Sequence, residues 1–489
     1  MKEVTLNGST APAISGLTHP PDTSGRRSPS AIGREWGTRN LLLPMSDRLM
    51  GHPMMRRLRV LERAQWWPRE RVLARQNELL RATIHTAYKE VPFYRELLDG
   101  AGVRPEDIRS AADLERIPIV EKAALRAAFP DRCVRRTHQR AWESSTSGSS
   151  GQGFFIREDN DTAGWYRASF MLSAEWAGWH IGDPHVMSGM RLQRSGVKAM
   201  KDHLLGCHYA KASDFTDQRL DETLDLVKTR GIRHIWGYPG FGYYLALRAE
   251  KRGWNTPLKT FVTWGDTLYP EYRATIERVF GVRVFDTYGC SEGFQICAQC
   301  GHGDTYHVHD LDVIAELLDD GANPVAPGEP GNVIITRLHA GPMPFIRYRV
   351  GDVAFRGTHE ACACGRGFST IGSIRGRDTD IIITPSGNRL VIHFWTGVMK
   401  LFPDVDCFQL IQTTSDRIRI LIVPNGELRP TTPSEIVKMY QQRGVTDMQI
   451  TIEAVRELPF TPGGKRRFII NELLQAPRPG GAPDARWTA

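Results

Sequence analysis

Between about residues 165 and 293, helical segments alternate with short runs of β-branched and aromatic residues. "DETLDLVKTRGIRHIWGYPG" reads as a helix followed by a strand and a turn. "TFVTWGDTLYPEYRATIERVFGVRVFDTYGCSEG" reads as strand, loop, helix, strand and loop. Helices placed between short strands predict βαβ units and a mostly parallel sheet. Ligands of such sheets bind on the loops that follow the strands, so "TWGD" and "TYGCSEG" are the predicted binding loops of an α/β fold.

Changes in composition divide the chain into three parts. Residues 1–58 are rich in Gly, Pro, Ser, Thr and Arg with little periodicity, and we expect a mobile N-terminal arm there. Residues 59–376 would form the large domain, helical at first and ending in a β-subdomain at about 310–376. Residues 377–489 show a β-β-α-β pattern, which predicts a small mobile α+β domain with a short disordered tail. The stretch "RGRDTDIII" is the candidate hinge between the two domains.

The composition excludes several classes of protein. The length of 489 residues suits two to four domains, and 41% hydrophobic with 24% charged residues is typical of globular proteins. The net charge of +8 comes without a block of Lys and Arg interleaved with aromatics, so we expect no nucleic-acid partner. No apolar run approaches 18 residues and no secretory signal is recognisable, so we expect a cytoplasmic protein without a membrane partner.

The stretch "ESSTSGSSGQG" at residues 143–153 has two interpretations. Such a run is often a flexible linker, but it can also be a loop that holds phosphate groups through backbone amides and hydroxyls. It lacks the lysine of the G-x-x-x-x-G-K-[ST] motif. Its position inside the first domain, directly before "FFIREDN", suits a linker poorly. The three glycines would let the backbone approach an anion closely.

The same loop carries a resemblance to a known family. "TSGSSGQG" resembles the phosphate loop of the adenylate-forming superfamily, which includes acyl- and aryl-CoA ligases. Four further stretches are similar to motifs of that family and follow in the same order: "TYGCSEG", "YRVGDVAF", "RGRDTDIII" and "LPFTPGGKRR". The stretches "VPFYRELL", "IPIVEK", "MPFIRYRVGD" and "CFQLIQ" resemble the phenylacetate–CoA ligase branch, especially its CapK-type relatives, over residues 65–475.

The resemblance implies attack of a carboxylate on the α-phosphorus of ATP, release of pyrophosphate and transfer of the acyl group to CoA. Lys465 would reach the carboxylate and α-phosphate oxygens, Glu292 would hold Mg²⁺, and Ser291 would touch the α-phosphate. Asp352 would accept the ribose hydroxyls, and Arg377 would contact ribose or phosphate near the hinge at Asp378 or Asp380. The other nucleotide-binding residues that it implies are Thr146, Ser147, Gly148, Ser149, Ser150, Gly151, Gly265, Asp266, Asp286, Thr287, Tyr288 and Gly289.

Two departures from the family pattern leave other functions open. Gln152 and Gly153 stand where the family often has a lysine and a small residue, and the glycine-rich turn after the hinge reads "TPSGNRLVIH". The acyl acceptor could therefore be an amine, a hydroxyl or a carrier-protein thiol instead of CoA. A third alternative is a zinc-stabilised protein that binds nucleotide without catalysis. The small-molecule partner would be a carboxylic acid, and a homodimer is left open.

Aromatic residues follow two of the predicted strands and suggest the class of acid. Trp236, Tyr238 and Phe241 lie in "IWGYPGFGYY", and Trp264 lies in "VTWGD". If they line the substrate pocket, a planar aryl acid would fit between them. The alternative is that these side chains pack the core.

Four cysteines form a C-x2-C pair and a C-x-C pair about 60 residues apart, in "CAQCGHGDTYHVH" and "CACGR". In a cytosolic chain this spacing suggests a metal before a disulfide, and thiolates with imidazoles suit tetrahedral structural zinc. Similar residues in some phenylacetate–CoA ligase relatives favour zinc held by Cys300, His307, Cys362 and Cys364. Cys297 competes for one of these positions, and unrelated free thiols are the alternative.

Overall fold

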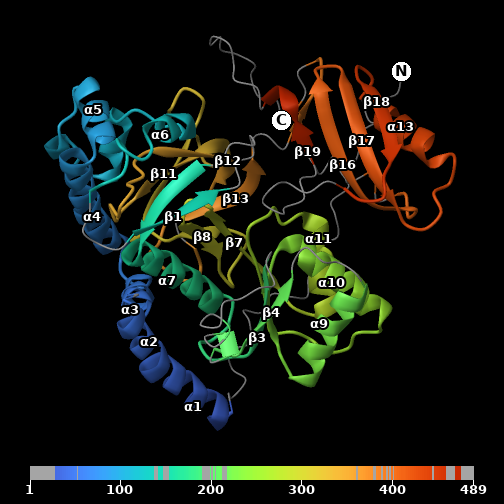
Figure 1. Cartoon of the computed structure of the whole chain (residues 1–489), viewed down its shortest axis with the longest axis horizontal. Coiled ribbons are helices and arrows are strands. Elements are labelled where there is room, and N and C mark those ends of the chain that lie inside the picture. The colour runs from blue at the N-terminus through green and yellow to red at the C-terminus, as the bar shows by residue number, and fades with distance from the viewer. Residues whose placement is uncertain are drawn as a thin grey trace, which may run out of the picture.

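The computed structural model describes residues 28–51, 53–136, 141–146, 154–189, 199, 202–203, 205–211, 217–358, 362–377, 381–386, 389–391, 395, 398–399, 401–442, 445–458 and 469–474. Its main feature is an eleven-stranded sheet in the order β10-β11-β12-β13-β9-β8-β7-β6-β5-β3-β4. Figure 1 shows this sheet running through the body of the molecule, with a separate C-terminal unit beside it.

One half of the sheet is parallel, as the alternating pattern predicts. Its strands are β3 (His185–Gly189), β4 (Cys207–Lys211), β5 (His234–Gly237), β6 (Thr260–Thr263) and β7 (Val284–Cys290). The helices around it are α7 (Asn160–Trp176), α9 (Asp217–Thr229), α10 (Pro239–Lys251) and α11 (Pro270–Phe280). The predicted α/β fold is confirmed. The predicted binding loop "TWGD" lies at the end of β6. Of "TYGCSEG", residues 287–290 belong to β7 itself, and only residues 291–293 form the turn after it.

Both faces of the parallel half are buried, because successive side chains of a strand point to opposite faces. Trp236, Val262 and Phe285 pack against α7 and α3 (Met54–Ala64). Their neighbours in the chain, Ile235, Phe261 and Val284, pack against α9, α10 and α11. This alternation explains why these strands read as short, almost continuous apolar runs.

The other half of the sheet is antiparallel. Its strands are β8 (Phe294–Gln299), β9 (Tyr306–Val308), β10 (Val313–Leu318), β11 (Pro330–Arg337), β12 (Tyr348–Arg356) and β13 (Thr370–Arg377). Helices α4 (Arg69–Glu90), α5 (Pro92–Gly100) and α6 (Lys122–Ala128) pack on it, with the 3₁₀ turns η2 (Pro105–Asp107) and η3 (Ala111–Arg116) between them. The strands predicted as a β-subdomain therefore continue the main sheet.

The part of the expected N-terminal arm that the structure describes is helical. Ser28 caps α1 (Pro29–Gly37), which continues through a π-helical turn, η1 (Thr38–Leu42), into α2 (Leu43–Met50). Gly51, in the left-handed conformation, ends α2, and α3 follows. Met54, Met55 and Leu58 of α3 are buried in the large domain.

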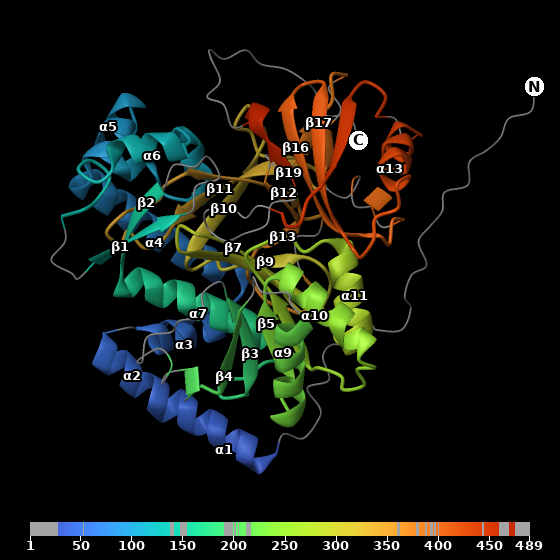
Figure 2. The same cartoon turned by 45° about the vertical axis from the view of Figure 1, so that its right-hand side comes forward.

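The C-terminal unit is a four-stranded sheet in the order β18-β17-β16-β19. Its elements are β16 (Val405–Thr414), β17 (Arg417–Pro424), α13 (Thr432–Gln442), β18 (Gln449–Ala454), β19 (Ile469–Asn471) and η4 (Glu472–Leu474). A two-stranded ribbon, β14 (Ile381–Ile383) with β15 (Arg389–Val391), precedes it, and the backbone of Ile383 is hydrogen-bonded to the Gln412 side chain. Figure 2 shows α13 against one face of this sheet. None of the helices in the described part of the chain is both long and apolar enough to cross a membrane.

Candidate active site

The Ser/Gly-rich loop connects the two strands of a hairpin. β1 (Ala141–Thr146) pairs antiparallel with β2 (Phe154–Asp159), and Thr146 stands opposite Phe154. The predicted phosphate-binding residues Ser147, Gly148, Ser149, Ser150 and Gly151, and the side chain of Thr146, lie outside the described residues. The flanking strands are paired up to Thr146 and Phe154, so the described residues on either side of this segment belong to one hairpin.

Glu292 lies in the turn between β7 and β8 and is only 2% exposed. Its Oε1 atom accepts a hydrogen bond of 2.8 Å from the hydroxyl of Tyr348 and lies 2.8 Å from Nζ of Lys122. Its Oε2 atom lies 3.5 Å from Oγ of the predicted Ser291. The glutamate predicted to hold magnesium is thus fixed in position by a cation and a phenol.

The surroundings of Glu292 keep its carboxylate ionised. Burial by itself raises the pKa of a carboxyl group. The Lys122 ammonium, together with the hydrogen bonds from Lys122 and Tyr348, outweighs burial and holds the pKa of Glu292 below its usual value. The same arrangement, through burial and the nearby carboxylate, raises the pKa of the Tyr348 phenol, so the hydroxyl stays a donor.

Phe154 connects this carboxylate to the Ser/Gly loop. It is the first residue of β2 and therefore stands at the end of the loop. Its ring stacks on Tyr348 with 6.5 Å between centroids, and Nζ of Lys122 lies 5.5 Å from its centroid. Both side chains that hold Glu292 thus contact the residue at which the loop ends.

Glycines shape the turn that carries Glu292. A Cβ atom on Gly289 would lie 2.3 Å from the carbonyl oxygen of Phe294, at a bulge in the β7–β8 pairing. Gly293 has a φ of +83°, and a Cβ there would lie 2.3 Å from Oε1 of Glu158. Arg337 donates to the Gly293 carbonyl. A side chain at either glycine would displace the turn, which accounts for two glycines of "TYGCSEG".

Asp352 on β12 is the predicted ribose ligand. Tyr288 donates a 2.7 Å hydrogen bond to Oδ2 of Asp352, and the Cα partner of Asp352 on β13 is Arg377. The side chain of Arg377 lies outside the described residues, as do Asp378 and Asp380. Tyr288 is largely buried and its pKa is raised by burial, so it positions Asp352 while most of its ring packs in the core.

The other predicted nucleotide-binding residues near the ends of β6 and β7 are partly buried and partly exposed. Asp286 is buried and accepts hydrogen bonds from Thr263 (2.6 Å) and Tyr306 (2.7 Å), which links β6, β7 and β9. Burial raises its pKa. Thr287 donates to the carbonyl of Thr263 at 2.9 Å. Gly265 and Asp266 are exposed after β6, and Gly265 has a φ of +82° that its turn requires.

The four aromatic residues predicted for the substrate pocket separate into two pairs. Trp236 and Phe241 are buried in the core on opposite faces of the sheet, which is the packing alternative. Tyr238 and Trp264 are partly exposed, with 6.2 Å between their ring centroids, and Trp264 also packs edge-on against Phe170 at 5.3 Å. Burial is the main cause that raises the pKa of Tyr238 to about 12.

Three further residues lie in the sequence motifs: Lys465, Lys122 and Tyr348. The predicted Lys465 falls in residues 459–468, between Leu458 and β19, outside the described residues. The sequence assigned no role to Lys122 and Tyr348, although "IPIVEK" and "MPFIRYRVGD", which contain them, carry part of the family likeness. The family motifs could therefore have pointed to Lys122 and Tyr348, but only the fold shows that both contact Glu292.

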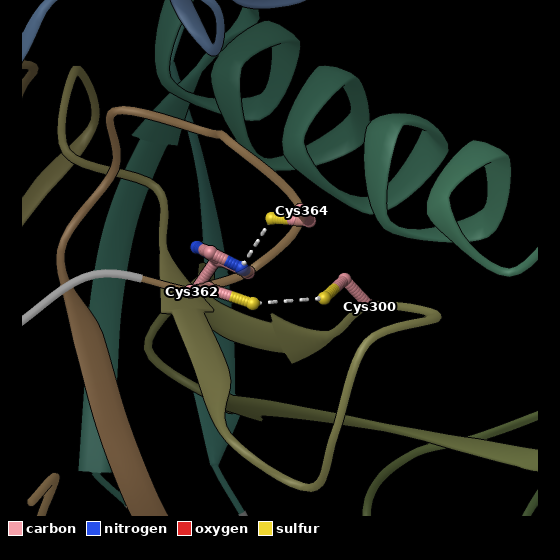
Figure 3. A group of neighbouring side chains, drawn as sticks. Cys300, Cys362 and Cys364 are labelled. Atoms are coloured by element: carbon pink, nitrogen blue, oxygen red, sulfur yellow. Dashed lines mark hydrogen bonds between the residues drawn. The ribbon is translucent and has the colours of Figure 1, made fainter. Parts of the chain in front are cut away.

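Three of the cysteines and one histidine come together where β8, β9 and β13 lie side by side. Cys300 follows β8, His307 lies on β9, and Cys362 and Cys364 lie on the loop before β13. One ligand atom from each of the four lies within 4.8 Å of all the others. The Sγ atoms of Cys300 and Cys362 are 3.7 Å apart, and Sγ of Cys364 is 3.2 Å from Nε2 of His307. Figure 3 shows the Cys362 sulfur directed at that of Cys300, and the Cys364 sulfur directed at the imidazole beside them.

The geometry of this group fits a tetrahedral ion. With zinc–sulfur bonds of about 2.3 Å, the sulfur atoms of a tetrahedral site stand about 3.7 Å apart. Three thiols and an imidazole are also a usual ligand set for structural zinc. Cys297 is not part of the group, since it is buried in the hydrophobic core with residues such as Val308. His309 is likewise buried elsewhere, with Nε2 3.0 Å from Oγ of Ser173.

Known proteins similar to this chain include two phenylacetate-coenzyme A ligases. A family model described as the CapK C-terminal domain matches residues 382–472. The phenylacetate-coenzyme A ligase of Thermus thermophilus is 29% identical over 336 residues, which is 65% of this chain and 72% of the relative. The ligase of the same name from Pseudomonas putida is 25% identical over 417 residues, 81% of this chain and 85% of the relative.

A solved structure shares the fold over most of the chain. It is a crystal structure of 2-hydroxyisobutyryl-CoA ligase in the postadenylation state, in complex with R3-HIB-AMP. The TM-score is 0.64 at 19% identity, and the match covers 84% of this chain and 91% of the solved chain.

Proposed function

We propose that this chain is an AMP-forming acid–CoA ligase of the phenylacetate–CoA ligase branch of the adenylate-forming superfamily, with a CapK-type C-terminal domain. It would activate a carboxylic acid with ATP, release pyrophosphate and transfer the acyl group to CoA. The relatives named as phenylacetate-coenzyme A ligases support both half-reactions.

One observation carries the proposal. A buried, ionised glutamate lies beside the end of a Ser/Gly-rich hairpin loop, because Lys122 and Tyr348 hold Glu292 and both contact Phe154. A carboxylate next to a loop of hydroxyls and glycine amides can hold a metal–triphosphate between them. The reaction needs this arrangement, because catalysis of attack at phosphorus depends on holding anions in place and neutralising charge.

The residues present fit a magnesium ion at Glu292. Oε1 of Glu292 is engaged by Lys122 and Tyr348, while Oε2 lies at the longer distance of 3.5 Å from Ser291. One carboxylate oxygen together with phosphate oxygens and water is a usual ligand set for Mg²⁺. When bound, the ion would neutralise charge on the phosphates, and Lys122 would add a second positive charge beside them.

The other proposed contacts follow the family motifs. Residues 146–151 would hold the β- and γ-phosphates, and the Asp352 carboxylate, positioned by Tyr288, would accept the ribose hydroxyls. Lys465 would approach the reacting carboxylate from the C-terminal domain. Rotation of that domain about residues 377–380 would then withdraw the lysine before the acyl group is transferred.

The cysteine and histidine group would bind structural zinc. Four protein ligands close the coordination shell, so no position remains for a substrate. The site would connect β8 and β9 to the loop before β13 and so stabilise this part of the sheet.

The acid itself is proposed to be aromatic. Tyr238 and Trp264 are the two predicted pocket residues that remain partly exposed, and a planar ring could pack between them. A panel of aryl and aliphatic acids, assayed for pyrophosphate release with and without CoA, tests the proposal. We expect release that depends on an aryl acid, and acyl-CoA formation when CoA is added. ATP binding without acid-dependent pyrophosphate release would refute it.

A further inference from the structure

The first helical segment carries a row of exposed apolar side chains. Ile32, Trp36, Leu41, Met45 and Leu49 are 55%, 60%, 58%, 57% and 80% exposed. They lie on α1, η1 and α2, whose backbone stays right-handed helical at each junction and whose 22 residues span about 33 Å. We call these five residues the apolar stripe.

The π-helical turn keeps the stripe on one face of the helix. Residues four apart lie on the same side of an α-helix, and the stripe advances by four residues at each step except from Trp36 to Leu41. That step of five crosses η1, where the amide of Leu43 donates to the carbonyl of Thr38. A turn of this kind contains one extra residue, so the five-residue step restores the alignment.

The opposite face of the same helix packs on the protein. Thr38 and Leu43 are buried, and a Cβ on Gly182 would lie 3.3 Å from the carbonyl oxygen of Arg34. Figures 1 and 2 both place α1 and α2 at the outer edge of the molecule, on the far side of α3 from the rest of the chain. The stripe therefore faces outward along its whole length, whereas a single exposed apolar residue would need no explanation.

The charge around the stripe is positive. Residues 29–64 contain seven arginines and three acidic residues, a net +4 out of +8 for the whole chain. All three acidic residues have partners within the protein: Glu35 and Glu62 pair with Arg39, and Asp47 accepts from the amide of Met55. The exposed charged side chains of this segment are all arginines: Arg34, Arg48, Arg56, Arg59 and Arg63.

Four of these arginines line a groove next to the stripe. The groove lies between α2, α3 and the start of α7, and its volume is 1270 Å³. Apolar side chains line it too, among them Pro44, Val60 and Trp67. Its three acidic residues are engaged by the protein, since Asp161 pairs with Arg57, Asp159 caps α7 and Asp47 accepts from the amide of Met55. We call it the arginine groove; its lining arginines are Arg48, Arg56, Arg59 and Arg63.

We propose that the apolar stripe and the arginine groove together bind an anionic phospholipid surface. The stripe would enter the boundary between headgroups and acyl chains, and guanidinium groups would pair with lipid phosphates. A second copy of the chain is a poorer partner, because a two-fold contact through the stripe would bring the two sets of arginines toward each other. This inference revises the expectation of no membrane partner, which rested on the lack of a long apolar run.

Sedimentation of the full-length protein with lipid vesicles tests this proposal. The probes are vesicles of phosphatidylglycerol mixed with phosphatidylcholine, and vesicles of phosphatidylcholine alone. We expect binding to the mixed vesicles that weakens with salt, and at least about tenfold weaker binding to the neutral ones. No binding to the mixed vesicles, or equal binding to both, overturns the proposal.

Two variants assign the binding to this surface. Leu41→Glu with Met45→Glu changes the stripe, and Arg48→Gln with Arg59→Gln changes the groove. Each should weaken vesicle binding by about tenfold or more. The matched control is Leu401→Glu, at an apolar residue 53% exposed outside the segment, which should bind like the unchanged protein.

Two further readouts separate lipid binding from unfolding and from self-association. All changed side chains are exposed, so the unfolding temperature of each variant should match that of the unchanged protein. If the stripe variant unfolds at a lower temperature, vesicle binding by the groove variant and its dependence on salt test the proposal instead. Gel filtration measures the oligomeric state of each variant. A dimer that the stripe variant breaks would assign this surface to a second copy and overturn the proposal, as would variants that bind vesicles normally.

Discussion

Lys122 and Glu292 form an ion pair in which Nζ lies 2.8 Å from Oε1, although one residue begins α6 and the other lies in the turn after β7. Glu292 is 2% exposed, whereas the Lys122 side chain is 32% exposed. The pair therefore places a positive charge between solvent and a buried carboxylate, beside the loop proposed to hold phosphate. The effect of this ion pair on stability can be tested separately from its effect on catalysis.

Removing the lysine alone should destabilise the protein. Lys122→Met leaves a buried carboxylate without its counter-charge, and we expect a loss of about 1–3 kcal/mol in the free energy of unfolding. Adding Glu292→Gln should recover most of that loss, because the neutral amide no longer needs the cation. Denaturant unfolding of the single and double variants measures this coupling. The exposed Lys228→Met serves as the control, and strictly additive effects would show that the pair is not coupled.

Replacing the glutamate should affect the chemistry far more than the fold. Glu292→Gln keeps the size of the side chain and can still accept from Tyr348, but it removes the charge proposed to hold Mg²⁺. We expect acid-dependent pyrophosphate release to fall by about 100-fold or more. A variant that unfolds normally and retains full pyrophosphate release would exclude Glu292 from the reaction.

Asp352 and Tyr288 should differ in their effect on ATP binding. Asp352→Ala removes the proposed acceptor of the ribose hydroxyls, and we expect the KM for ATP to rise by about tenfold or more with a smaller change in kcat. Tyr288→Phe removes only the 2.7 Å hydrogen bond that positions the carboxylate, so its effect on the KM should be smaller but in the same direction. A KM for ATP that neither variant changes contradicts the assignment.

The metal site predicts a difference between two buried cysteines. Cys300→Ser should lose about one equivalent of zinc and unfold at a lower temperature, because a ligand of the proposed site is removed. Cys297→Ser is the matched control, since Cys297 lies three residues earlier but packs in the core. Mass spectrometry measures the zinc content of each variant, and thermal unfolding with and without a chelator measures its stability. Zinc retained by Cys300→Ser, or absent from the unchanged protein, would exclude the site.

Asp312 should make stability fall as the pH rises. Burial raises the pKa of this carboxyl to about 6 in the folded protein, and neither of its oxygens accepts a hydrogen bond from the described residues. A folded-state pKa above the unfolded value means that ionisation opposes folding between about pH 4 and 6, and the penalty persists above pH 6.

Asp312→Asn should therefore stabilise the protein at pH 8 by about 1–3 kcal/mol, and by about a third of that amount at pH 4.5. Denaturant unfolding of both proteins at the two pH values tests this. An equal effect at both pH values would show that the titration of Asp312 does not control stability.

Local pattern was enough to predict the architecture, but not which residues meet. Alternating helices and strands indicate a parallel sheet because neighbouring segments of the chain form each βαβ unit, and the TYGCSEG stretch could be found because it ends a predicted strand and resembles a family motif. Lys122 could not be paired with Glu292, since nothing in the spacing connects α6 to β7. Cys297 and Cys300 look equivalent in sequence, yet one lies inside β8 and the other beyond its end.

Burial also separated residues that the sequence grouped together. Trp236 occupies a strand position whose side chain points into the core, whereas Trp264 follows the end of its strand and stays partly exposed. The apolar stripe could not be recognised in the sequence, because one extra residue in η1 interrupts the usual helical period.

A crystal structure of the protein with Mg²⁺ and a non-hydrolysable ATP analogue tests the central claim most directly. We expect the β- and γ-phosphates against residues 146–151, the metal on Glu292 and the ribose on Asp352. A nucleotide bound away from Glu292 and from the β1–β2 loop would contradict the account.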